Sequence, residues 1–394
     1  MGGGLELITQ DQVDALGRTT KETDPNGNVT YTVYLDTNYE VRVYRGWNSS
    51  TNLPTGPTED YRYDRPGSYF ETLTMSATPH TTNGAPDGTE AISNLQTLAR
   101  DYTNSAGQVT ASDAYFNLSA VTYSTVAHIG ILNTNYYETT DDYDVRGRLA
   151  RVGLPTGTIE RTVDDGLDRV VSTWVGTNDT PASGQWSPTN NTSPSNMVQI
   201  TGDVYDGGGV GDGNLTQETQ YPGGSAANRV SNYYFDWRDR LVASKEGVQA
   251  SEDTTTHRPI TFNTFDNLDE ITQVQQFDGD GVTITSSNGV PQAPSASLLR
   301  AQTNVSYDDQ GRVYQTQTYS VNPSTGAVSS TALTTNSFYN LRGLLIATYA
   351  PGGLATKDAY DGAGRVTTEY TSDGGSGPLS WISASSVGND TVLE

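Results

Sequence analysis

Short runs of alternating apolar and polar residues, separated by turn-forming residues, recur along most of the chain. Residues 29–35 are an example. Alternation with a period of two is typical of β-strands, whose successive side chains point to opposite faces of a sheet. The pattern therefore predicts a chain built mainly of short strands.

The clearest turn between two such strands lies at residues 360–366. Asp361 is suited to open a type I turn, Gly364 supplies the positive φ of the following bulge position, and Tyr360 and Val366 lie on the flanking strands. Arg365 begins the return strand, where its guanidinium is placed to pair with the aspartate or to stack on the tyrosine ring of the same motif. This stretch predicts a β-hairpin with a short loop.

Copies of this turn occur along most of the preceding chain. They keep an aromatic residue, an acid, a glycine, an arginine and an aliphatic residue in one order, which unrelated turns would not do, so they indicate a repeat array. The clear copies are 143–149 and 307–313, and 235–241 is a less perfect one. The more divergent copies are 265–271, 339–345 and 163–170, and 14–18 and 63–67 keep only the turn half.

The spacing of the copies predicts the organisation of the chain. Gly147 and Asp168 are 21 residues apart, as are Gly343 and Gly364, so longer spacings indicate loop insertions. We expect an N-terminal extension at 1–13, the repeat array at 14–371 and a tail or partial repeat at 372–394. The expected insertions are 77–100, 178–196, 206–214, 247–259 and 279–297.

Two stretches near the middle of the first half depart from this pattern. Ile92, Leu95 and Leu98 have helical spacing, so a short helix is predicted within 89–100. Residues 115–132 are interpreted as consecutive strands.

The composition favours a thin, sheet-like body over a densely packed sphere. Hydrophobic residues make up 34 % of the 394 residues, the mean hydropathy is −0.56, and there are 24 tyrosines. The chain is thus polar yet rich in strand formers. The net charge of −24 argues against nucleic acid as a partner and is best explained as a means of staying soluble.

The remaining composition excludes some chemistry. The chain has no cysteine, which removes disulfides, thiolate nucleophiles and zinc–sulfur sites. No apolar run approaches the roughly 20 residues of a membrane span. The residues at the two ends, 1–5 and 393–394, resemble those of an excised fragment, and we expect a longer natural protein.

The repeated turn, together with the intervening half at 24–31, resembles the YD repeats of the RHS and teneurin-like families. The resemblance implies antiparallel hairpins that form a curled or spiral sheet, a partial β-shell, in a large secreted or cell-surface protein. In RHS toxins and insecticidal toxin complexes such shells enclose a toxic domain, and in teneurins they serve adhesion. The Asp-Pro-x-Gly-Leu segment that ends the bacterial toxin shells is not found, because the one Asp-Pro pair lies at 24–25.

The sequence predicts no catalytic, cofactor-binding or metal-binding residue, and we expect no enzyme. His80, His128 and His257 lie far apart without a glutamate or histidine at metal-ligand spacing, so they are interpreted as ordinary surface or strand residues. Calcium is considered at 278–281 and 206–214, but turn formation is the favoured role of both.

Paired acids are the remaining candidates for chemistry. The pairs at 141–142 and 308–309 are compatible in type with a glycosidase. Neighbours in a strand point to opposite faces, however, and an aspartate that opens a turn already has a structural role. The glycosidase hypothesis is therefore not favoured.

Three functions are consistent with these observations. The first is a non-enzymatic structural shell or scaffold segment of a secreted or cell-surface protein. The second is adhesion, with a protein or carbohydrate bound by Trp47, Trp174, Trp186 or Trp381, although packing is the favoured role of these tryptophans. The third is self-assembly into a filament or surface layer through exposed edge strands.

Overall fold

The computed structural model describes residues 7–209 and 211–372, and these residues form an almost entirely β structure. Twenty-four strands belong to one antiparallel sheet that is not closed, and two further hairpins each form a two-stranded sheet. The predicted fold class, an all-β array of antiparallel hairpins in a curled sheet, is confirmed. Within the described ranges there is no α-helix, and hence none long and apolar enough to cross a membrane.

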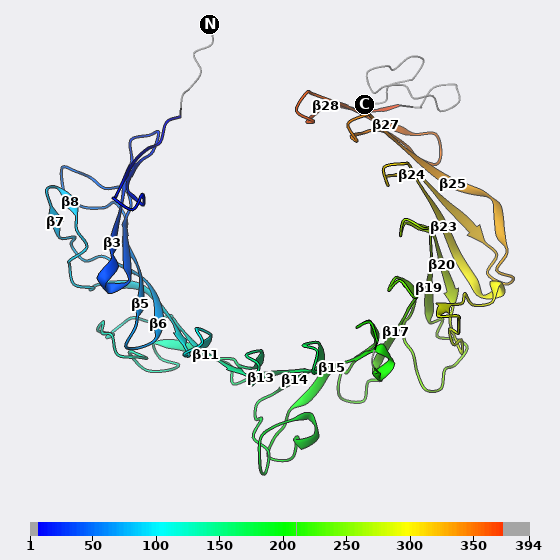
Figure 1. Ribbon diagram of the computed structural model, residues 1–394, viewed down its shortest axis with the longest axis horizontal. Helices are drawn as coiled ribbons and strands as arrows, with labels where there is room; N and C mark the ends of the chain where they lie inside the picture. Colours follow the sequence, from blue (N-terminus) through cyan, green and yellow to red (C-terminus); the bar gives the residue numbers. More distant parts are fainter. Residues whose placement is uncertain (1–6, 210, 373–394) are drawn as a thin grey trace, which may run out of the picture. The chain divides into compact units, whose positions relative to one another are not determined.

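The chain divides into two compact units, Met1–Gln199 and Ile200–Glu394. Figure 1 shows the strands of each unit in chain order. The strands that begin in the first unit are β1 (Gln10–Val13), β2 (Thr19–Thr23), β3 (Val29–Leu35), β4 (Glu40–Tyr44), β5 (Thr58–Asp64), β6 (Tyr69–Met75), β7 (Thr81–Thr82), β8 (Ala85–Pro86), β9 (Leu95–Thr103), β10 (Val109–Tyr115), β11 (Tyr136–Tyr143), β12 (Leu149–Gly153), β13 (Ile159–Asp164), β14 (Val170–Gly176) and β15 (Val198–Tyr205). Two 3₁₀ turns, η1 (Asp36–Asn38) and η2 (Pro188–Asn190), lie between them.

The second unit continues the same plan. Its strands are β16 (Leu215–Gln220), β17 (Arg229–Phe235), β18 (Leu241–Lys245), β19 (Pro259–Phe265), β20 (Ile271–Asp278), β21 (Ser286–Ser287), β22 (Val290–Pro291), β23 (Leu299–Tyr307), β24 (Val313–Val321), β25 (Val328–Tyr339), β26 (Leu345–Tyr349), β27 (Ala355–Tyr360) and β28 (Val366–Ser372), with 3₁₀ turns η3 (Asp206–Gly208) and η4 (Ala296–Leu298).

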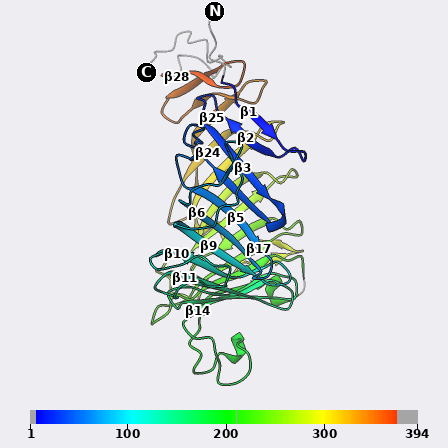
Figure 2. The same cartoon turned by 90° about the vertical axis from the view of Figure 1, so that its left-hand side faces the viewer.

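Within each unit the sheet strands pair antiparallel with the next one along the chain, as the strands of the first unit in Figure 2 illustrate. In the described residues this order steps over a hairpin from β6 to β9 and from β20 to β23, because β7–β8 and β21–β22 pair separately. The sheet is thus built almost wholly from local hairpins.

The repeated turn has the predicted geometry. In the 143–149 copy, Asp144 Oδ1 accepts hydrogen bonds from the backbone amides of Arg146 (2.8 Å) and Arg148 (3.0 Å), while Arg148 Nε donates to Asp144 Oδ2 at 2.8 Å. These contacts, led by the Arg148 amide, lower the pKa of the Asp144 carboxyl to about 2. Gly147 takes a φ of 82°. The same bonds recur at Asp14, Asp165, Asp236, Asp308 and Asp361.

The tyrosine of the motif joins one hairpin to the preceding one. The pairing of β20 with β23 ends at Gln273 and Asn304, so the carbonyl of Ile271 lies beyond the ladder. The hydroxyl of Tyr307 donates to that carbonyl at 3.0 Å. The equivalent donor–acceptor pairs are Tyr143 with Val109 (2.9 Å), Tyr339 with Val313 (3.0 Å) and Tyr360 with Leu345 (2.7 Å). Each hydroxyl therefore closes the gap where two neighbouring hairpins separate.

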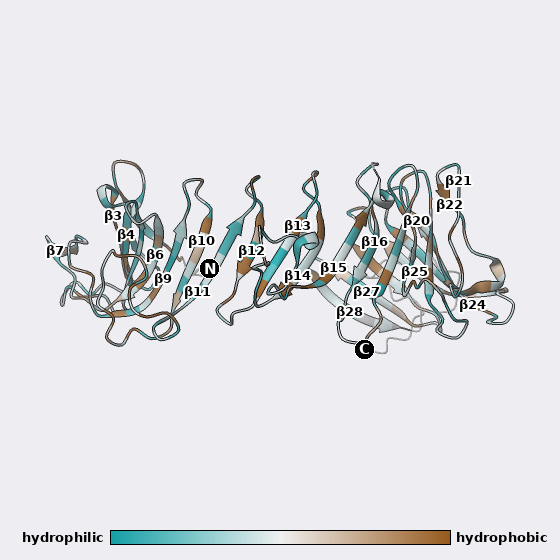
Figure 3. Cartoon of the chain, turned by 90° about the horizontal axis from the view of Figure 1, so that it is seen from below, coloured by the Kyte–Doolittle hydropathy of each residue, from teal (hydrophilic) through white to brown (hydrophobic). Residues whose placement is uncertain are grey.

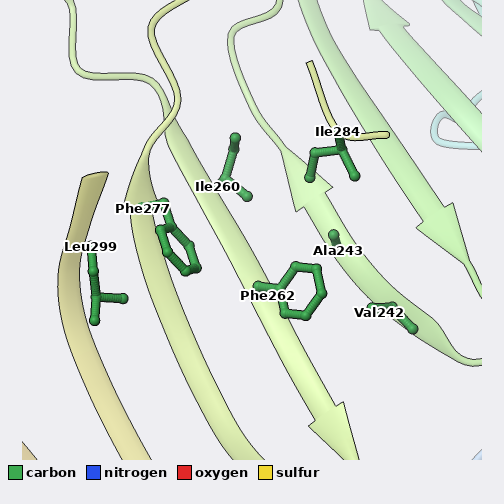
Figure 4. Packing of buried hydrophobic residues seen from close by; sticks show 7 residues of the cluster. All are labelled: Val242, Ala243, Ile260, Phe262, Phe277, Ile284 and Leu299. Atoms are coloured by element: carbon green, nitrogen blue, oxygen red, sulfur yellow. The ribbon is translucent and has the colours of Figure 1, made fainter. Parts of the chain in front are cut away.

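The apolar core is small and divided. Figure 3 shows hydrophobic and hydrophilic residues interspersed along the strands rather than gathered in one apolar layer. The second unit buries a cluster on β18–β20 and β23 with one residue of the β20–β23 connection (Figure 4): Val242, Ala243, Ile260, Phe262, Phe277, Ile284 and Leu299. The first unit buries Leu73, Met75, Ala77, Leu98 and Ile129.

Two sequence predictions are wrong. Residues 95–100 of the predicted helix belong to strand β9, because β9 pairs with β6 from Leu95 to Tyr102 and this pairing overrides the helical spacing. The predicted strands within 115–132 are a loop, since β10 ends at Tyr115 and β11 begins at Tyr136. The predicted tail at 372–394 lies outside the described residues except for the last residue of β28.

Candidate functional site

A row of charged residues crosses six strands of the first unit on one face. Residues directly opposite each other in an antiparallel pair lie on the same face, so the strand registers define the row. It runs through Glu40, Arg62, Glu71, Arg100, Asp113 and Glu138, each opposite the next. The charges alternate along this row until Asp113 and Glu138, where two acids meet.

Loops of the same unit cover the row. Figure 1 shows segments 77–94 and 116–135 on the same side of the unit's strands. Arg100 is fully buried beneath the second of them: its Nε donates to Glu71 at 2.7 Å, and its other nitrogens donate to the backbone carbonyls of Val126 and Ser124, both at 2.6 Å. The guanidinium also lies 4.6 Å from the centre of the Tyr69 ring. Arg100 thus holds a loop against the sheet.

A second group of buried charges surrounds Arg42. Its Nε lies 3.0 Å from Asp60 Oδ2 and also contacts Glu40, and its Nη1 lies 3.1 Å from Glu90 of the 77–94 loop. Three acids therefore share one guanidinium. Burial, and next the charge of Glu40, raises the pKa of Asp60 to about 8.

The row ends at a group made of Asp113, Glu138 and His128, in which the histidine comes from the 116–135 loop. His128 Nδ1 lies 2.9 Å from Asp113 Oδ2 and 3.3 Å from Glu138 Oε2. Asp113 is 1 % exposed and its Oδ1 has no hydrogen-bond partner among the described residues. Burial raises the pKa of Asp113, and the nearby His128 opposes this shift.

Tyr102 fixes the orientation of this group. The backbone amide of His128 donates to the Tyr102 hydroxyl at 2.8 Å, and that hydroxyl donates to Asp113 Oδ2 at 3.0 Å. The imidazole stacks on the Tyr102 ring at 4.3 Å between centroids. His128 has a φ of 54°, a conformation that non-glycine residues rarely adopt.

The other two histidines also contact acids. His257 Nδ1 lies 3.1 Å from Asp278 and 3.9 Å from Asp280, the two acids of the segment weighed for calcium. Arginines bind the same acids: Arg258 Nη1 lies 2.9 Å from Asp280, and Arg300 Nη2 lies 3.3 Å from Asp278. The chain's own cations thus neutralise this group.

The remaining candidate acids have local structural contacts. His80 Nδ1 lies 2.6 Å from Asp87 within one exposed loop. In the 206–214 segment, Asp206 Oδ1 accepts from the amides of Gly213 (2.9 Å) and Asn214 (3.1 Å), which is turn formation.

The paired acids behave as the strand and turn arguments predict. Asp308 opens a repeat turn by accepting from the amides of Gln310 and Arg312. Asp142 pairs with Arg151 at 3.3 Å, whereas its neighbour Asp141 lies on the opposite face of β11. Neither pair brings two carboxyls together on one face.

Packing explains the described tryptophans of the adhesion hypothesis. Trp47 is 6 % exposed and meets the rings of Tyr31 and Tyr44 edge-on. Trp174 packs edge-on against Trp186 at 5.6 Å, and Arg161 lies over the Trp186 ring at 4.8 Å. Trp381 lies outside the described residues.

The acidic partners of His128 could not be recognised from the sequence, because they lie on other elements of the chain. Asp113 and Glu138 come from two strands on either side of the loop that carries His128. One signal was available in the sequence. Glu71, Arg100 and Asp113 each lie two residues from apolar or aromatic residues of the same strand, so they fall on a face that would ordinarily hold apolar side chains.

The comparisons with known proteins give weak likenesses. No protein-family model matches the chain, and no curated protein sequence does. Among solved structures, it is similar to the crystal structure of TcdB2-TccC3-Cdc42 (TM-score 0.36, 13 % identity, 92 % of this chain) and to that of TcdB2-TccC3 without the hypervariable C-terminal region (TM-score 0.36, 12 % identity, 92 % of this chain). It is also similar to the Photorhabdus luminescens Tc holotoxin pore (TM-score 0.31, 13 % identity, 93 % of this chain). The chain spans about a fifth of the length of these chains, between 19 % and 22 %.

Proposed function

We propose that the chain is a non-enzymatic scaffold, a wall segment of a larger secreted or cell-surface YD-repeat protein that encloses or displays another part of that protein. The observation that carries this proposal is that the residues of the repeat motif bind one another and the neighbouring hairpins. Asp144, for example, is held by three donors of its own turn, and Arg148 Nη1 continues to Asp168 of the next turn at 2.8 Å.

The same chain of contacts recurs in the second unit. Arg238 and Arg240 both reach Asp269 of the following turn at 3.0 Å. Arg342 donates to the backbone carbonyls of Asp361 (3.2 Å) and Gly362 (3.0 Å). A motif whose polar groups bind one another in this way stiffens the sheet and leaves few free polar groups for catalysis. Stiffness without chemistry is what we expect of a wall.

The loops of the first unit leave one face of its sheet open. The row of buried charges lies under the loops, so residues at the alternate strand positions face the other way. Among them, Tyr61, Phe70 and Tyr137 are each about half exposed (46 %, 52 % and 47 %). We assign the contact with an enclosed or displayed segment to this open face, because exposed aromatic side chains are favoured at protein contacts.

Limited proteolysis of the complete natural gene product tests the proposal. We expect a neighbouring segment to be cleaved rapidly alone and to be protected when joined to this chain. Phe70→Glu on the open face should remove the protection, whereas Val145→Glu, at a fully exposed turn position, should leave it unchanged. Equal cleavage of the neighbouring segments with and without this chain would refute enclosure.

A further inference from the structure

We propose that His128, Asp113 and Glu138 bind one divalent transition-metal ion of the Zn²⁺ class, which fastens the 116–135 loop to the sheet. The group offers one imidazole nitrogen and two carboxylate oxygens, and these three atoms lie within 4.8 Å of one another. A mixed nitrogen and oxygen ligand set suits zinc and its neighbours, whereas calcium and magnesium prefer oxygen alone.

The spacing of the ligand atoms agrees with coordination. Ligands at about 2.0 Å from a tetrahedral zinc ion are about 3.3 Å from each other. The distances from His128 Nδ1 to the two carboxylate oxygens are 2.9 Å and 3.3 Å. Two of the three distances between ligand atoms are therefore close to those around a bound ion, and the third lies within 4.8 Å.

The charge of the group also calls for a cation. Asp113 lies opposite Arg100 on one side, but that guanidinium is engaged by Glu71 and two loop carbonyls. On its other side Asp113 lies opposite a second acid, Glu138. Asp113 is almost completely buried and its Oδ1 has no hydrogen-bond partner among the described residues, which is costly for a carboxylate. A divalent ion bound through Oδ2 would balance the two negative charges of the group.

Tyr102 supports the proposed ligand Asp113 with a hydrogen bond. Ligating carboxylates are commonly hydrogen-bonded by a neighbouring side chain, and the Tyr102 hydroxyl donates to Asp113 Oδ2 at 3.0 Å. Because that hydroxyl accepts the His128 amide, its proton is directed to the carboxylate. The side chains of His128 and Glu138 are 40 % and 25 % exposed, which gives an ion and a water molecule access from solvent.

The competing explanation is a protonated His128 that bridges the two acids without a metal. Isothermal titration of the chelator-treated full chain with Zn²⁺, and in parallel with Mn²⁺ and Ca²⁺, distinguishes the two. We expect saturable binding of Zn²⁺, with Ca²⁺ far weaker. If Zn²⁺ does not bind to the wild-type chain, the bridged arrangement is correct and the metal site is refuted.

Variants locate the site. His128→Gln and Glu138→Gln alter partly exposed side chains and should each weaken Zn²⁺ binding at least tenfold, and Tyr102→Phe should weaken it about 10- to 100-fold. The matched control is His257→Gln, which removes the histidine of the His257, Asp278 and Asp280 group and should leave the affinity unchanged. Circular dichroism of each metal-free variant checks that it folds.

A second measurement reports on the loop itself. Zn²⁺ should slow proteolytic cleavage within 116–135 in the wild-type chain and have no such effect in His128→Gln. Binding that survives His128→Gln, or that disappears in His257→Gln, would place the ion elsewhere and overturn the proposal.

Discussion

The second unit allows the tyrosine hydroxyl that joins neighbouring hairpins to be removed at one hairpin and introduced at another. Tyr307→Phe removes the donor to the Ile271 carbonyl. At the equivalent place in an earlier hairpin the chain has Phe235, and the pairing of β16 with β17 ends at Gln217 and Asn232, so the Leu215 carbonyl occupies the position of Ile271. Phe235→Tyr therefore introduces a hydroxyl where the register provides an acceptor.

The expected effect is about one hydrogen bond in each direction. A typical intramolecular hydrogen bond contributes about 1 kcal/mol net to the free energy of unfolding. For a unit of this size, about 1 kcal/mol corresponds to a change of about 2–4 °C in the melting temperature. Tyr307→Phe should thus lower the melting temperature of the second unit by about that amount, and Phe235→Tyr should raise it by a similar amount.

Differential scanning calorimetry of the full chain measures both shifts, with Tyr314→Phe as the control because that side chain is 43 % exposed on β24. A Tyr307→Phe shift no larger than that of the control would show that the hydroxyl does not link the hairpins. If Tyr307→Phe is destabilising but Phe235→Tyr has no effect, the register argument for Leu215 is wrong.

Two further predictions concern the buried acids and the turns. The pKa of Asp60 is raised in the folded state, so between about pH 4 and 8 the folded chain holds a proton that the unfolded chain has lost. This group therefore makes the free energy of unfolding fall as the pH rises through that window, by at most about 1.4 kcal/mol per pH unit. Asp60→Asn should flatten the dependence in urea unfolding at several pH values, and an unchanged slope would contradict the assignment. Gly364 has a φ of +81°, and the atom nearest to the place that a Cβ would take is 3.8 Å away, so Gly364→Ala should cost about 1 kcal/mol from backbone strain alone. Gly362→Ala, which has open space around it and no positive φ, should be nearly neutral in the same assay, and equal costs at the two positions would contradict the strain argument.

The turns could be predicted from the sequence because each one is specified by residues within the turn itself. Asp361 and Arg365 pair as expected, at 2.8 Å between Nε and Oδ2. The predicted stacking of arginine on tyrosine also occurs, but between repeats: Arg312 lies 4.5 Å from the ring centre of Tyr339 in the next hairpin. A partner in the next repeat depends on register, which a single motif does not specify.

The candidate metal group could not be predicted for the same reason. Its acids reach His128 only after β9, β10 and β11 have paired in order, and the helical spacing within 89–100 concealed the first of these strands. The loop at 116–135 was hidden in a similar way, because its apolar residues resemble strand residues in the sequence but pack over the face of the sheet, as Ile129 does.

The alternating charges of the row specify the register that brings these groups together. In β5 and β6, Arg62 lies opposite Glu71, with Asp60 and Asp64 two positions away on either side of Arg62. A slip of two residues in one direction would place Asp60 opposite Glu71, and a slip in the other direction would place Asp64 there, so both bring two buried acids together. A slip of one residue would turn every side chain of the strand to the other face. Buried ion pairs add little net stability compared with apolar residues of the same size. The row is therefore best understood as the feature that selects one strand pairing in a sheet with a small apolar core. The place where its alternation stops, at Asp113 and Glu138, is where we propose the metal ion.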